Sequence, residues 1–180
     1  MDISRLRLPQ SLLTLNLSSN EIELVSVLIL PPFLEDFNLS FNPTQDVLDM
    51  VFPPTLKTLN LSGNRIHDIS TLIFPLNLVE LDLSHNHIKD LSCLNLGAQF
   101  NMRKFSFCLN EFSVSAFQLP KNLKFLFLEG TRIVNFMNFK FPDTLVELDL
   151  RETAIWDASA LKLPAGLKSL VLSGNRMKNF

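Results

Sequence analysis

The residues of this chain that could support nucleophilic catalysis are Cys108, His85 and Asp82. A thiol beside an imidazole, with a carboxylate nearby, is the arrangement that activates a cysteine nucleophile. If the three residues lie on neighbouring strands about 4.8 Å apart, a contact between the thiol and the imidazole is possible. An open sheet would give them no pocket, no evident oxyanion donors and no exclusion of water. We therefore expect no catalysis and interpret the pair as a surface thiol beside an imidazole.

These residues belong to a phrase that recurs eight times, Leu-x-x-Leu-x-Leu-x-x-Asn or a close variant. It begins at Leu12, Leu34, Leu56, Leu78, Met102, Leu123, Leu145 and Leu167. The spacing is 22 residues, except for a gap of 24 before Met102 and one of 21 after it. A fixed period of this length is typical of a solenoid, in which each repeat contacts only its neighbours.

We number each repeat from the first residue of the phrase. Positions 1, 4 and 6 are apolar, whereas positions 3 and 5 are mostly polar. This period of two predicts a short, half-buried strand with positions 3, 5 and 7 facing water, and stacked strands would form one parallel sheet. Only about eight residues, often ending in Phe-Pro or Leu-Pro, separate the post-strand turn from the next strand. The outer side is therefore expected to contain 3₁₀ turns and extended chain, with little α-helix.

Position 9 is asparagine in six repeats and threonine at Thr131 and Thr153. An inward asparagine can bond the open backbone groups of its own turn and of the neighbouring turn. Threonine has fewer donors, so the ladder of hydrogen bonds is expected to be thinner in those two repeats.

The three histidines are not expected to form a metal site. His85 and His87 flank Asn86, and His67 belongs to the preceding repeat. His87 is at position 10 and His67 at position 12, so the two are not expected to stack in one column. The sequence has no glycine-rich phosphate loop, no Cys-x-x-Cys and no His-Glu-x-x-His. It therefore predicts no metal, no cofactor and no enzyme.

The overall charge excludes some classes of partner. Lys and Arg number 16 and Asp and Glu 18, which gives a net charge of −2 and no basic excess for nucleic acid or an anionic membrane. No apolar run approaches the roughly 20 residues of a membrane span.

Cys93 and Cys108 are expected on opposite faces, without a disulfide. Asn-Leu-Ser acceptors recur on one face, where sugars would crowd it. Both features favour a cytoplasmic, reducing location.

The whole chain, residues 1–180, is interpreted as a single repeat domain. It begins and ends within a repeat and shows no polar capping segment at either end. We expect a piece of a longer array, or alternatively an array capped by a partner or by its own copy. Exposed edges of the end strands would permit self-association.

The eight copies resemble the leucine-rich-repeat family, over essentially the whole chain. The 22-residue length is similar to the short class in phosphatase-regulating repeat proteins. The Leu/Phe-Pro-x-x-Leu lead-in resembles bacterial effector repeats of about 20 residues, and arrays in large protist and oomycete proteins, some joined to kinases. The resemblance implies an α/β solenoid: a right-handed horseshoe with a concave parallel sheet of about eight short strands, which usually binds a protein.

The regular concave surface changes in repeats five to seven. Phe125 and Phe127 occupy positions 3 and 5 of one strand, where other repeats carry mostly polar residues. The charged residues expected around them are Lys104, Glu129, Glu147, Asp149 and Arg151. Paired aromatics within a charged rim are typical of a binding hot spot. An alternative is that the rings lie on the stem of Lys104 or against a neighbouring domain.

The leading hypothesis is therefore a non-enzymatic protein-interaction scaffold that binds a protein partner through its concave sheet. The alternative is an internal spacer or regulatory arm of a larger protein, such as a protist or oomycete kinase or a bacterial effector. Self-assembly through the end edges is a third hypothesis.

Overall fold

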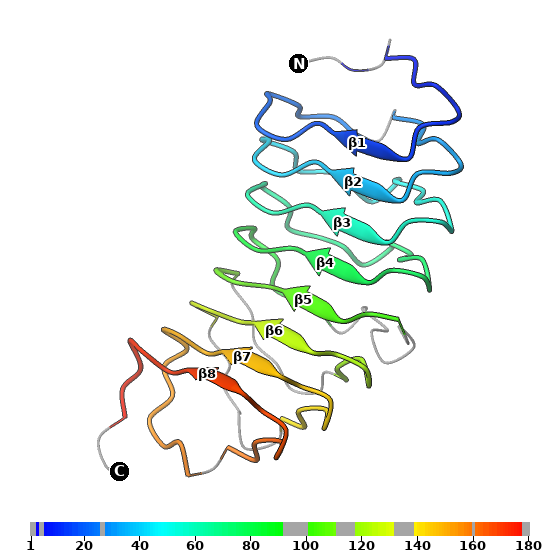
Figure 1. Cartoon of the computed structure of the whole chain (residues 1–180). Helices are drawn as coiled ribbons and strands as arrows, with labels where there is room; N and C mark the ends of the chain where they lie inside the picture. The colour runs from blue at the N-terminus through cyan, green and yellow to red at the C-terminus, as the bar shows by residue number, and fades with distance from the viewer. Residues whose placement is uncertain are drawn as a thin grey trace.

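The computed structural model describes residues 3, 6–25, 28–91, 101–110, 118–131, 139–159 and 161–177 of the 180-residue chain. Eight three-residue strands form one parallel sheet in sequence order. They are β1 (Thr14–Asn16), β2 (Asp36–Asn38), β3 (Thr58–Asn60), β4 (Glu80–Asp82), β5 (Lys104–Ser106), β6 (Phe125–Phe127), β7 (Glu147–Asp149) and β8 (Ser169–Val171). Figure 1 shows them as a single stack from blue β1 to red β8. The predicted solenoid and its eight strands are confirmed.

The register of the sheet is constant along the stack. Each position 3 pairs with the position 3 of the next strand, and each position 5 with the next position 5. This holds across the unequal gaps, because Glu80 pairs with Lys104 and Lys104 with Phe125. The extra and missing residues are therefore accommodated outside the strands. The apolar residues at positions 1, 4 and 6 form one continuous core from repeat to repeat.

The outer side is thin, as predicted, and the described residues include no helix. Single turns of 3₁₀ type occur there, in which Leu28 donates to the carbonyl of Val25 at 2.9 Å and Leu72 to that of Ile69 at 3.1 Å. Each described Pro-x-x-Leu lead-in is a β-turn, as where Leu56 donates to Pro53 at 3.1 Å. No helix in the described part of the chain is long and apolar enough to cross a membrane.

The asparagine at position 9 links neighbouring repeats. The Asn86 amide donates to the carbonyls of Leu61 and Leu83, both at 3.0 Å, and of Ser84 at 3.2 Å. Its Oδ1 accepts the N–H of Ile66 in the preceding repeat at 3.0 Å. One side chain therefore bonds backbone on two turns.

Threonine at position 9 bonds its own repeat instead. The Thr153 hydroxyl donates to Leu150 at 2.8 Å, and the Thr131 hydroxyl donates to Leu128. Both acceptors lie three residues earlier in the same repeat, so neither hydroxyl reaches the carbonyl that an asparagine would reach in the preceding turn. The predicted thinning of the ladder in repeats six and seven is confirmed.

The expectation that position 7 faces water is wrong for Ser40, Ser62 and Ser84, which are buried. In these repeats the side chain at position 5 accepts the N–H of position 7 at the end of the strand. Asn60 Oδ1, for example, accepts both the N–H of Ser62 at 2.9 Å and its hydroxyl at 2.7 Å. Such Asx turns fix the end of each regular strand.

Position 8 has a left-handed backbone in all eight repeats, with φ between 52° and 73°. This conformation favours glycine, yet the position holds five other residues, Phe41 among them. The Phe41 ring lies over Gly63 of the next repeat, where an added Cβ would come within 2.6 Å of it. In three places a large side chain at position 8 is followed in the next repeat by a glycine that makes room for it: Phe41 and Gly63, Leu109 and Gly130, Glu152 and Gly174.

A candidate binding site on the concave face

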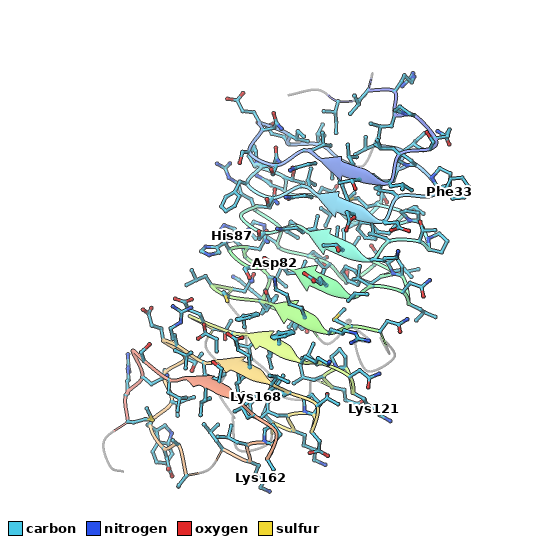
Figure 2. The ribbon with its side chains drawn as sticks, viewed as in Figure 1. Phe33, Asp82, His87, Lys121, Lys162 and Lys168 are labelled. Carbon is cyan, nitrogen blue, oxygen red and sulfur yellow. The ribbon has the colours of Figure 1, made fainter. Side chains whose placement is uncertain are left out.

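We call the side of the sheet that carries positions 3 and 5 the concave face, and Phe125 and Phe127 the aromatic pair. Figure 2 shows this face toward the viewer, with Asp82 on its surface. Both rings are half-buried, whereas Leu126 between them is fully buried in the core. The alternation of strand β6 therefore places both rings on the concave face, as predicted, and each keeps part of its surface exposed.

The register places the aromatic pair between charged neighbours. Phe125 pairs with Lys104 on β5 and with Glu147 on β7, and Phe127 pairs with Asp149 on β7. The Lys104 Nζ lies 3.7 Å from the Glu80 carboxylate on β4, so its ammonium is directed away from Phe125. Sequence reasoning missed Glu80, although its place opposite Lys104 in the same column is a signal that could have found it.

Arg151 holds two carboxylates in what we call the Arg151 clamp. Its Nη2 lies 2.7 Å from Glu129 Oε2 and 2.6 Å from Asp149 Oδ2, and its Nε donates to both oxygens of Asp149. This hydrogen bonding raises the pKa of the Arg151 guanidinium, which stays charged. Asp149 is only 4% exposed. Its predicted place beside the aromatic pair is observed, but its carboxylate is occupied within the chain.

The concave face is acidic. Positions 3, 5 and 7 carry six carboxylates and two basic side chains: Asp36, Glu80, Asp82, Glu129, Glu147 and Asp149 against Lys104 and Arg151. Both basic groups are held by acidic neighbours in the ion pairs described above. The charge left unpaired on this face is therefore negative, although the net charge of the whole chain is only −2.

The aromatic pair interrupts the regular hydrogen bonding of the strand ends. In five repeats, including those of Asn38 and Asp82, the position 5 side chain accepts the N–H of position 7. Phe127 has no acceptor to offer the amide of Glu129. A local rule that five of the eight repeats keep is thus broken at the aromatic pair, where apolar surface faces outward, as is common at functional sites.

The candidate nucleophile is not activated. The His85 N–H donates to the carbonyl of Cys108 at 2.7 Å, so the contact between these residues runs through the backbone. Burial raises the pKa of the Cys108 thiol, and the charges of Glu129 and Asp149 act in the same direction. Asp82 accepts the N–H of Ser84 at 2.9 Å and so serves the strand end. A neutral thiol is a poor nucleophile.

The histidines depart from expectation. His67 and His87 do meet, with ring centroids 5.0 Å apart. The expectation failed because neighbouring turns are offset after position 9. The N–H of His87 donates to the carbonyl of Ile66, one position further along the preceding repeat. Residues at the same repeat position are therefore neighbours in the strands but not in this turn.

Comparisons with known proteins agree with the geometry. A family model described as Leucine Rich repeat matches residues 9–27, 52–69 and 75–97. The structure of YopM from Yersinia enterocolitica is similar, with a TM-score of 0.73 and 27% identity over 97% of this chain and 40% of that one. An internalin (inlF) from Listeria monocytogenes gives 0.81 and 22%, over 95% of this chain and 50% of that one.

Internalin C2 from Listeria monocytogenes gives a TM-score of 0.80 and 25% identity, over 91% of this chain and 72% of that one. The chain thus spans half or less of the first two structures. A comparison with curated protein sequences finds no match. The matches in sequence and in structure fall on the same repeating unit of strand, inward asparagine and short outer turn. The three matched segments are leucine-rich repeats, and the molecule has the fold of a leucine-rich-repeat solenoid.

Proposed function

We propose that this solenoid is a non-enzymatic interaction scaffold whose concave face binds a protein partner at the aromatic pair. The observation that carries the proposal is two half-exposed phenylalanines on one strand of a rigid sheet, in columns that are mostly polar elsewhere. Fully burying a phenylalanine contributes about 1.5–3 kcal/mol by area, and the exposed part of each ring is available for this. Aromatic anchors of this kind dominate the energetics of interfaces.

The charge of the concave face supports a partner with basic groups around an apolar anchor. Asp36, Asp82 and Glu147 remain outside the ion pairs that hold Lys104 and Arg151. Complementary charge raises the association rate and makes it sensitive to salt. The affinity for such a partner is therefore expected to fall as ionic strength rises.

The test is a double variant, Phe125→Thr with Phe127→Asn, which copies the Thr-Leu-Asn spelling of β1 and β3. It removes the apolar anchor and supplies the Glu129 N–H with the position 5 side-chain oxygen that accepts this bond in five other repeats. We expect the double variant to stay folded by circular dichroism and to lose at least tenfold in affinity for partners captured from the native source.

The matched control is Phe33→Ser, which removes an exposed ring at the margin where the strands begin (Figure 2). Partner binding should survive this change. Undiminished binding by the double variant, at unchanged secondary structure, would refute the proposed site.

The other two hypotheses have their own observations. At position 4 of β8, Leu170 is 36% exposed, whereas every other described strand keeps this residue at 8% or less. Self-association would cover the apolar surface at this edge, whereas a regulatory arm of a larger protein needs no second copy. Light scattering over a concentration series separates these two, since only self-association raises the mass with concentration.

A reducing, cytoplasmic location is part of the proposal. Cys108 is a free thiol, and Cys93 lies outside the described residues. Two of the three glycosylation acceptors, Asn38 and Asn60, are half-buried and use Oδ1 to hold the N–H of position 7. Their structural use supports a chain that is not glycosylated there. Fractionation of the native source would test the location.

A further inference from the structure

The stacked histidines form a second feature, apart from the concave face. The rings of His67 and His87 have centroids 5.0 Å apart and planes inclined by 27°. Both side chains are exposed. Figure 2 shows His87 at the margin where the strands end, away from the opposite margin that carries Phe33 and Lys121. Neither the aromatic pair nor the Arg151 clamp involves this margin.

The backbone beneath the two histidines is fixed. The His87 N–H donates to the Ile66 carbonyl at 2.9 Å, and the Ile66 N–H donates to Asn86 Oδ1 at 3.0 Å. Ile66 and Asn86 directly precede the two histidines and are buried. The backbone beneath the two imidazoles is therefore fixed by hydrogen bonds between the two turns, so little backbone freedom is lost when both rings bind one ion.

The separation of the rings suits a shared metal ion. A divalent ion lies about 2.0–2.1 Å from an imidazole nitrogen, and so about 3.2 Å from the ring centroid. Two such rings at coordination angles of about 90–110° have centroids roughly 4.5–5.2 Å apart, by the same distances. The observed 5.0 Å falls in this range. Exposed rings can rotate about the Cβ–Cγ bond to aim a nitrogen at the ion.

The charged surroundings are balanced. Arg65 and Lys89 lie in the same turns as the histidines, and Asp68 and Asp90 follow at position 13. Hydrogen bonds from Ser70 lower the pKa of Asp68, which therefore stays ionised at neutral pH. Within the described residues no group of three or more metal-ligating side chains occurs. Water would complete the coordination of an ion held by the two histidines.

We propose that His67 and His87 form a two-histidine site for a late first-row divalent ion, of the class of Zn²⁺, Ni²⁺ or Cu²⁺. Neutral imidazole suits these ions, whereas Mg²⁺ prefers oxygen ligands. Because the ligands come from adjacent turns, a bound ion links repeats three and four at the margin where the strands end. It binds the folded chain in preference to the unfolded one and so stabilises these repeats.

The experiment titrates EDTA-treated, dialysed full chain with NiCl₂ or ZnCl₂, followed by isothermal calorimetry and by the thermal unfolding midpoint. The variants are His67→Gln, His87→Gln and the control His85→Asn, which removes the third histidine, two residues before His87. We expect His67→Gln and His87→Gln each to weaken affinity at least tenfold and to abolish the rise in midpoint. His85→Asn should match the parent chain, and MgCl₂ should have no effect.

Circular dichroism of each variant without metal establishes that it is folded. The proposal is overturned if a folded His67→Gln or His87→Gln variant binds as tightly as the parent chain. It is also overturned if His85→Asn removes the binding.

Discussion

Repeats one to four and repeats five to seven build the same strands with different side chains. In the first group position 5 is Asn or Asp, position 7 is Ser and position 9 is Asn, and these residues bond the backbone. In the second group position 5 includes Phe127, position 7 includes Arg151 and position 9 becomes Thr in two repeats. The apolar spine is unbroken in both.

The comparison shows which interactions specify the fold and which can be exchanged. Leu81 and Leu126 at position 4 are equally buried in the two regions, so the stack is maintained by the core. In the second region repeats five and six lack the hydrogen bond from position 7 to the side chain at position 5, repeat seven keeps it, and the Arg151 clamp joins side chains on β7 and beside β6. The exposed aromatic pair thus lies in the region where part of the ladder is missing.

The largest expected effect distinguishes the two ladders. Asn86→Ala removes four hydrogen bonds and leaves the buried N–H of Ile66 without an acceptor, which should cost about 2–3 kcal/mol. Thr153→Ala removes a hydroxyl that bonds Leu150 in its own repeat and lies 3.2 Å from Asn175 Oδ1 in the next repeat, and should cost about 1 kcal/mol. Denaturant unfolding of both variants checks this order, and equal losses would contradict the contrast between the two regions.

A second change should affect both regions alike. At Gly63 an added Cβ meets the Phe41 ring at 2.6 Å, and at Gly130 it meets Leu109 at 2.3 Å, both at positive φ. Replacing either with alanine should therefore destabilise the chain by about 2 kcal/mol. Gly166→Ala is the control, because its Cβ would lie 3.6 Å from the nearest atom at an ordinary φ. A clear difference between the stability losses of Gly63→Ala and Gly130→Ala would show that position 8 also differs between the two regions.

A third change should make the second region more like the first. Thr131→Asn introduces an amide long enough to reach the preceding turn, as Asn110 reaches Leu83 at 2.9 Å. We expect a gain of about 0.5–1 kcal/mol in the free energy of unfolding. A loss of stability would mean that the turn after β6 has adapted to threonine.

The smallest effect concerns Cys108, which occupies the place of a buried serine. Because burial and nearby carboxylates raise its pKa, the folded chain keeps the thiol protonated to higher pH than the unfolded chain. This contribution to stability is complete below the pKa of the unfolded thiol and is lost as pH rises through that of the folded one. In a Cys93→Ser background, alkylation at pH 8 should be slower for folded than for unfolded protein. Equal rates would exclude the shift.

The strands and their register could be predicted from sequence because period two and period 22 fix which residues face the core. Lys104, Phe125 and Glu147 accordingly lie side by side. The loops could not be predicted in the same way. After position 9 the inward asparagine bonds the preceding turn at an offset, and this brought His67 to His87 against expectation.

Other details depended on side-chain conformations that a repeat pattern does not contain. The burial of Ser62 follows from its bonds to Asn60, and the burial of Asp149 from its bonds to Arg151. Both pairs lie two residues apart on one strand end. The repeat pattern predicted on which face of the sheet these residues lie, but not the direction in which their side chains point.

The constant register across segments of 24 and 21 residues has a consequence for how such an array can change. Mutations that lengthen or shorten an outer connection leave every strand opposite its old neighbours. The residues on the exposed face of the sheet can therefore change one strand position at a time, while the outer connections between strands accept insertions independently. A lineage carrying this architecture can vary recognition and loop size as separate traits.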